Sequence, residues 1–179
     1  MMFTQGVRKL GLTAHVSCSV GWFGSIAAFL ALAISGLTSA DAQTVRAAYL
    51  AMDLIGWFVI VPLCFGSLLT GLAQSLGTHW GLFRHYWVLL KLLITVLATL
   101  LLLVHMQPVG HLARVVAERT LAGGEMAGLR IQLIADAAAA LVALLINATL
   151  SVYKPRGRTP YGWRKRREEL MTSRRRTAI

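Results

Sequence analysis

The chain alternates between long apolar stretches and short polar connections. Four stretches are almost wholly apolar over the length of a helix, at about 15–37, 47–73, 86–108 and 129–152. A transmembrane helix needs about 20 such residues to cross the hydrocarbon core of a bilayer. The connections at 38–46, 77–85 and 110–128 are short, and residues 112–121 in the last of them can form an amphipathic interfacial helix. The pattern predicts an all-α, polytopic membrane protein in which residues 1–152 form a bundle of four transmembrane helices.

The composition of the chain strengthens this prediction. Of its 179 residues, 56% are hydrophobic and only 14% are charged, whereas an average soluble domain has about 25% charged residues. Such a chain has too little polar surface for a soluble enzyme and too many apolar residues for a disordered protein. Two cysteines, Cys18 and Cys64, make neither a disulfide framework nor a CxxC motif.

The positive charge of the chain is concentrated at one end. The formal net charge is +11, and ten of the 18 Lys and Arg residues lie in 152–179. A basic segment directly after an apolar helix favours a membrane surface over nucleic acid. We therefore expect 153–179 to be a basic tail on anionic lipid, with docking of a partner protein as the alternative. Thirteen Lys and Arg residues lie on the side of the two termini and four on the other side, which predicts that both termini are cytoplasmic.

Polar residues recur inside all four apolar stretches at intervals of three and four. Residues with this spacing share one face of a helix, so each predicted helix has one semi-polar stripe that should face the bundle interior. The stripe of the second helix includes Asp53 and Trp57, and that of the fourth includes Gln132 and Asp136. By depth the ionisable groups form two layers. The outer layer holds Asp53, His105 and Asp136, and the inner layer holds His15, Lys91 and Asn147, with Arg84 at the inner interface.

The outer layer combines carboxylates with an imidazole. Asp53, His105 and Asp136 are a set that can bind a divalent metal such as copper or zinc, and one histidine can ligate a haem iron. The alternative is a buried His–Asp pair that holds the bundle together without a cofactor.

The inner layer has a lysine at its centre. An amine inside a bilayer is deprotonated, is paired, or binds an anionic group. Lys91 and Arg84 can hold porphyrin propionates. The alternative for Lys91 is snorkelling, because it lies only about one and a half turns inside its helix.

Two segments resemble a broad group of small bacterial membrane proteins: His15 followed by Trp-Phe-Gly at 22–24, and Arg-His-Tyr-Trp-Val-Leu-Leu-Lys-Leu at 84–92. That group includes the HemJ-type protoporphyrinogen oxidase and the membrane domain of the copper-resistance protein CopD. Residues 47–91 and 150–157 are similar to an uncharacterised bacterial family of four-helix integral membrane proteins. The resemblance implies haem b or a porphyrin near His15, with Lys91 beside it, and a place in the bacterial cytoplasmic (inner) membrane.

Three functions are compatible with these features. The first is a haem- or metal-binding membrane protein with a redox or porphyrin-related role, in which His15 is an axial ligand. The second is transport of copper, another cation or protons by an oligomer, for which the small residues Ala135, Ala139 and Ala143 permit close helix packing. The third is a structural or accessory subunit without a cofactor. The chain has no dinucleotide fingerprint, Walker A loop or HExxH motif, so nothing indicates hydrolytic chemistry.

Overall fold

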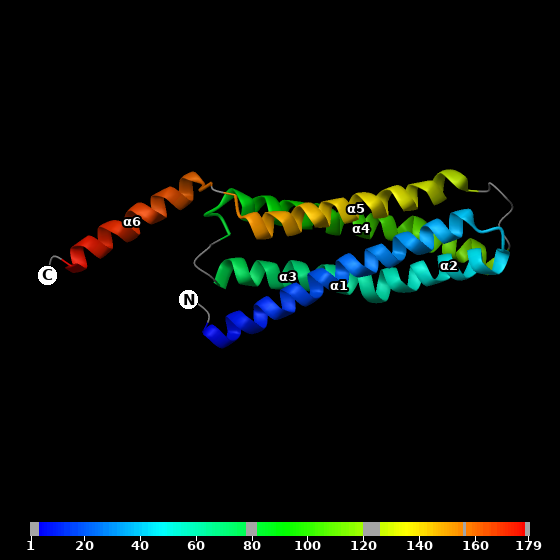
Figure 1. Ribbon diagram of the computed structural model, residues 1–179, viewed down its shortest axis with the longest axis horizontal. Helices are drawn as coiled ribbons and strands as arrows, with labels where there is room; N and C mark the ends of the chain where they lie inside the picture. Colours follow the sequence, from blue (N-terminus) through cyan, green and yellow to red (C-terminus); the bar gives the residue numbers. More distant parts are fainter. Residues whose placement is uncertain (1–3, 78–81, 120–125, 156, 178–179) are drawn as a thin grey trace.

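The computed structural model describes residues 4–77, 82–119, 126–155 and 157–177, and in the last segment the side chains up to residue 172. The described residues form helices throughout (Figure 1). The elements are α1 (Gln5–Thr38), α2 (Ala42–Ile55), the π-helical turn η1 (Gly56–Ile60), α3 (Val61–Gly77), α4 (Tyr86–Glu118), α5 (Ala127–Tyr153) and α6 (Pro160–Thr177).

The helices run up and down in turn. Figure 1 shows α2 and α3 as one rod that runs back along α1, while α4 and α5 form a second antiparallel pair beside it. Helix α1 packs against α2, α3 and α5, and α4 packs against the same three helices. The N-terminus and α6 lie at the same end of the bundle (Figure 1). We call this the inner end and the opposite one the outer end, following the predicted orientation.

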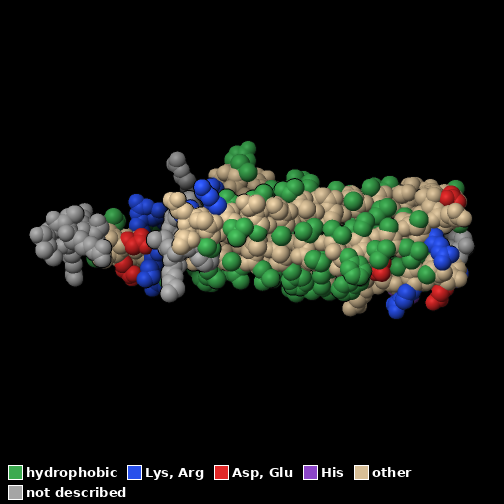
Figure 2. Space-filling view, turned by 90° about the horizontal axis from the view of Figure 1, so that it is seen from below, with side chains coloured by type: hydrophobic (Ala, Val, Ile, Leu, Met, Phe, Trp, Pro, Cys, Tyr) green, Lys and Arg blue, Asp and Glu red, His purple; other side chains and the backbone are tan. Residues whose placement is uncertain are grey.

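Four helical segments are long and apolar enough to span a membrane: Gln5–Thr38, Ala42–Gly77, Tyr86–Glu118 and Ala127–Tyr153. Large apolar side chains point away from the bundle on all sides. Examples are Val20, Phe58 and Leu101, which are 67%, 76% and 68% exposed. In Figure 2 most of the charged side chains lie near the two ends of the bundle. A helix bundle that is apolar both inside and outside is a membrane bundle, so the predicted fold is confirmed.

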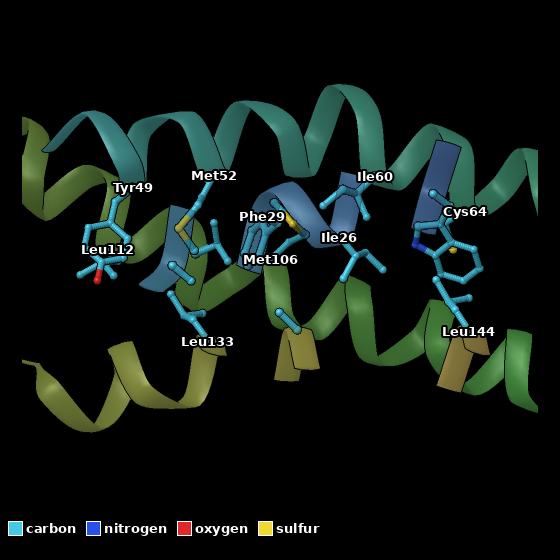
Figure 3. Packing of buried hydrophobic residues seen from close by; sticks show 14 of the residues in the cluster. Ile26, Phe29, Tyr49, Met52, Ile60, Cys64, Met106, Leu112, Leu133 and Leu144 are labelled. Atoms are coloured by element: carbon cyan, nitrogen blue, oxygen red, sulfur yellow. The ribbon is translucent and has the colours of Figure 1, made fainter. Parts of the chain in front are cut away.

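The interior is packed from large apolar residues of all four spans. Figure 3 shows them in successive layers, from Tyr49 and Leu112 near the outer end to Cys64 and Leu144 toward the inner end. Tyr49 is 1% exposed and both Leu112 and Cys64 are 0% exposed. These buried residues hold the helices in register and leave the polar groups at defined depths between them.

The second span contains a π-turn that the sequence pattern does not predict. The N–H of Val61 bonds to the carbonyl of Gly56, five residues earlier, which inserts one residue into the helical repeat. Trp57 therefore faces outward and is 49% exposed, whereas Gly56 is buried. The prediction that Trp57 lies on the interior stripe is wrong for this reason. The helices approach closely at Gly56, where a Cβ would lie 2.5 Å from the terminal methyl of Met106.

Helix α4 continues ten residues past the end of the predicted span at 108. Pro108 lies inside it and removes one backbone hydrogen bond. Beyond it, Leu112, Ala113 and Val116 are buried, and this apolar face keeps the helix packed on the bundle. The segment 110–118, predicted as a connection, is thus helical.

Helix α6 is attached to the turn before α4. The Thr159 N–H bonds to the Arg84 carbonyl at 3.1 Å, and its hydroxyl donates to the Phe83 carbonyl. The same hydroxyl accepts the Gly162 N–H at 3.1 Å, as an N-cap residue does. The basic tail therefore begins at a fixed position on the inner end.

Candidate functional site

The outer polar layer is built around one histidine. His105 of α4 and Asp136 of α5 meet with Nδ1 2.9 Å from Oδ2. The His105 side chain is 13% exposed and that of Asp136 is 47% exposed, and the ring of Phe29 packs at 5.9 Å from the imidazole. The carboxylate accepts the proton of Nδ1, which fixes the tautomer with a lone pair on Nε2.

Two polar atoms in this layer are buried and have no hydrogen-bond partner among the described residues. They are Nε2 of His105 and Oδ1 of Asp53. Asp53 faces a different part of α4, since a Cβ on Gly110 would lie 3.5 Å from its Oδ1. The structure thus brings His105 and Asp136 together and places Asp53 against Gly110, and the described residues contain no group of three or more potential metal ligands.

The inner layer is a continuous ladder of hydrogen bonds across α3, α4 and α5. The Cys64 Sγ lies 3.1 Å from the Thr99 hydroxyl, and the Thr99 hydroxyl donates to the Thr95 carbonyl at 2.7 Å. The Asn147 amide donates to the Thr95 hydroxyl at 2.8 Å. The Lys91 amine donates to the Ser151 hydroxyl. Lys91 is therefore held inside the bundle by α5. Its amine has a partner there without reaching out to the membrane interface.

His15 lies in the same layer on the other side of the bundle. Its Nδ1 is 3.0 Å from the Ser67 carbonyl and 3.2 Å from the Thr70 hydroxyl of α3. The ring packs closely on Gly71, where a Cβ would lie 2.9 Å from Cε1. A bond from Nδ1 to a carbonyl leaves Nε2 as the basic nitrogen, as in many ligating histidines.

Arg84 contacts the basic tail. Its guanidinium forms an ion pair with Glu169 of α6, at 2.8 Å. The three residues proposed to bind a cofactor therefore lie at one end of the bundle but do not meet: His15 contacts α3, Lys91 contacts α5, and Arg84 contacts the tail.

An apolar layer separates the two polar layers. Thr99 and His105 are six residues apart on α4, which is about 9 Å along a helix axis. Figure 3 shows Phe29, Met106, Ile26 and Ile60 between Met52 and Cys64, and all four are at most 5% exposed. Polar groups near the two membrane faces are thus divided by a dry middle.

Arg130, one of the four basic residues counted on the side away from the termini, is buried. It is 7% exposed. Its Nε donates to the Tyr49 hydroxyl at 2.8 Å, a second guanidinium nitrogen donates to the Gly36 carbonyl, and the guanidinium lies 5.6 Å from the centre of the Tyr49 ring. The signal in the sequence is the position of Arg130 in the first turn of the fourth apolar stretch, at 129–152.

Comparisons of the chain with models of protein families, with curated proteins and with solved structures find no match. The resemblance to HemJ-type and CopD-type proteins therefore stays a prediction, as does haem binding.

Proposed function

We propose that this multi-pass membrane protein conducts protons across the bacterial cytoplasmic membrane, with His105 as the proton-binding residue of the outer layer. The observation that carries the proposal is the Nε2 atom of His105, which is buried and has no hydrogen-bond partner in the described part of the chain, while Asp136 holds Nδ1 at 2.9 Å. Buried polar atoms in native proteins nearly always have partners, so an unpaired nitrogen in a membrane interior indicates a binding site.

The chemistry follows from the tautomer. A proton from the outer side binds the lone pair of Nε2 and forms an imidazolium. The Asp136 carboxylate stabilises this charge, and the unpaired Asp53 oxygen adds a second negative group in the same half of the bundle. Titratable groups placed along one path are typical of proton relays. On the inner side the Lys91–Ser151 and Asn147–Thr95 bonds form a second polar layer, and a conducted proton has to cross the apolar layer between the two.

A proton suits this site better than a metal ion. Asp136 already binds Nδ1, so His105 offers a single nitrogen, and copper or zinc in proteins is held by three or four ligands. A proton needs one lone pair only. A metal ion at this place needs ligands from a second copy of the chain.

An oligomer is part of the proposal because one face of α5 is polar where lipid would cover a monomer. Gln132, Ala135, Asp136 and Ala139 are all exposed and share one side of the helix. Carboxylates in membrane helices almost always face protein or water. A second copy packed on this face covers Asp136, and the small residues allow the close approach.

The test is proton flux into liposomes that contain the purified protein and an internal pH dye, driven by a potassium gradient with valinomycin. We expect His105→Gln to lower the flux to the level of protein-free liposomes and Asp136→Asn to lower it strongly. His111→Gln is the matched control, because His111 lies on the same helix but is exposed at the outer end. Equal flux in the wild type and His105→Gln, with both folded, would refute the proposal. Stoichiometric copper or zinc that is lost in His105→Gln would replace the proton with a metal ion.

A second candidate function is haem or porphyrin binding in the inner layer, which the Ser67 bond to Nδ1 of His15 favours. Against it, Lys91 and Arg84 have protein partners in place of propionates, and the close packing on Gly71 leaves no gap between α1 and α3 at the ring. The visible absorption spectrum of protein expressed with haem precursor, oxidised and reduced, tests it. A Soret band that His15→Ala removes would establish haem ligation, and a colourless sample that conducts no protons would leave an accessory subunit.

A further inference from the structure

A groove opens on the membrane-facing side of the inner end, away from the polar layers. It has a volume of about 510 Å³, within the range of about 300–1,000 Å³ that is usual for small-molecule sites. Its walls come from α4, the end of α5 and the connection to α6, and are formed by Tyr86, Trp87, Leu89, Leu90, Leu93, Leu150, Pro155 and Gly157.

The depth of the groove matches an acyl chain that starts at the headgroup level. Tyr86 is the first residue of α4, and Leu93 lies seven residues further along, or about 10 Å deeper along the axis. Tyr and Trp side chains prefer the interface between headgroups and hydrocarbon. The mouth of the groove is therefore at the interface, and its apolar floor extends into the hydrocarbon core.

Two basic residues flank the wall of the groove in the sequence. Lys154 directly precedes Pro155 of the wall, and Arg158 directly follows Gly157. The Arg158 guanidinium lies 5.7 Å from the centre of the Trp163 ring, which fixes it near the start of α6. The two nearby acids, Glu168 and Glu169, are paired with Lys165 and Arg84 at 2.9 and 2.8 Å. An apolar groove with a cationic mouth is complementary to an amphiphile with a negative head.

We propose that this groove binds an anionic phospholipid, with an acyl chain against Leu90 and Leu93 and the phosphate near Lys154 and Arg158. The lipid would connect α4, α5 and the root of α6 on their open side. The proposal is independent of proton transfer through the bundle, because none of these residues belongs to the two polar layers.

Quenching of tryptophan fluorescence by brominated lipids tests the site. The protein in mild detergent is titrated with phosphatidylglycerol or phosphatidylcholine that carries bromine on the acyl chain. We expect preferential quenching by phosphatidylglycerol, and we expect Trp87→Phe to remove the preferential component because Trp87 lines the groove.

Two sets of variants separate a site from general attraction to a positive surface. Lys154→Gln with Arg158→Gln should weaken the preference for phosphatidylglycerol by about thirtyfold, since each basic residue near a membrane surface contributes about fivefold. Arg8→Gln with Lys9→Gln removes the same charge from the inner end of α1 and should leave the preference unchanged. If the first pair unfolds, Leu90→Phe fills the groove from its exposed side without adding a tryptophan and should abolish the preference instead.

Three results would overturn the proposal. They are equal quenching by both lipids in the wild type, an equal loss of preference in the two charge pairs, and preferential quenching that survives both Trp87→Phe and Leu90→Phe. The first would point to an uncharged apolar occupant and the second to diffuse surface charge.

Discussion

Arg130 connects three helices at the outer end, and its removal should cost more stability than any change of a surface charge. Gly36 lies in the last turn of α1, where carbonyls have no partner within the helix. Arg130 of α5 donates to that carbonyl and also to the Tyr49 hydroxyl of α2. A cation at a helix C-terminus also interacts favourably with the helix dipole.

The magnitude can be worked out from these contacts. A hydrogen bond from a charged donor contributes about 1.5–3 kcal/mol, and Arg130 makes two, while its own desolvation offsets part of the gain. We expect Arg130→Met to lower the free energy of unfolding by about 2–4 kcal/mol and Tyr49→Phe to lower it by about 1 kcal/mol. Because the two side chains are partners, the double variant should lose about 1 kcal/mol less than the sum of the single losses.

The assay is equilibrium unfolding in detergent micelles, followed by far-UV circular dichroism. Arg114→Met is the matched control, since Arg114 is an exposed arginine at the same end of the bundle, and its change should stay within about 0.5 kcal/mol. An Arg130→Met variant as stable as the control would contradict the reasoning. So would a double variant whose losses simply add, because the Tyr49 bond would then contribute nothing.

Three further predictions concern the connections between helices. Hydrogen bonds from the first turn of α2 lower the pKa of Asp41. The stabilisation by this N-cap is therefore present above about pH 4 and is lost as the pH falls through the lowered pKa. In thermal melts, the stability difference between wild type and Asp41→Ala should shrink between about pH 6 and pH 3. Gly36→Ala should destabilise the protein by about 1–3 kcal/mol, because the added Cβ would lie 2.8 Å from the Tyr49 ring. Gly24→Ala should be tolerated, because nothing lies within 4 Å of a Cβ there. An unchanged melting temperature for Gly36→Ala would count against the close contact between Gly36 and Tyr49. Thr159→Val should speed amide exchange in α6, since it removes a cap of about 1 kcal/mol; unchanged exchange would mean that α6 is held by other contacts.

The sequence pattern predicts the outer and inner layers but not how their members pair. His105 and Asp136 were expected at one depth, and they meet at 2.9 Å. Asp53 was expected with them, yet it faces Gly110 because the side of a helix, unlike the depth, depends on how the neighbouring helices are rotated. Lys91 and Arg84 were expected to share one anionic ligand, but one is bonded to α5 and the other to α6. The spacing of residues along the chain cannot distinguish polar groups that pair from polar groups that only share a depth in the membrane.

Hydropathy alone determined the four spans and the all-helical class, because a bilayer requires about 20 apolar residues per span and satisfies backbone polar groups only within a helix. The charge bias also determined the predicted orientation. Only the tertiary structure decided which polar groups are paired. The π-turn at Gly56–Ile60 turned Trp57 outward, and Arg130 found an acceptor 94 residues away in the chain. Such outcomes depend on close packing between helices distant in sequence, where a shift of one residue changes every contact.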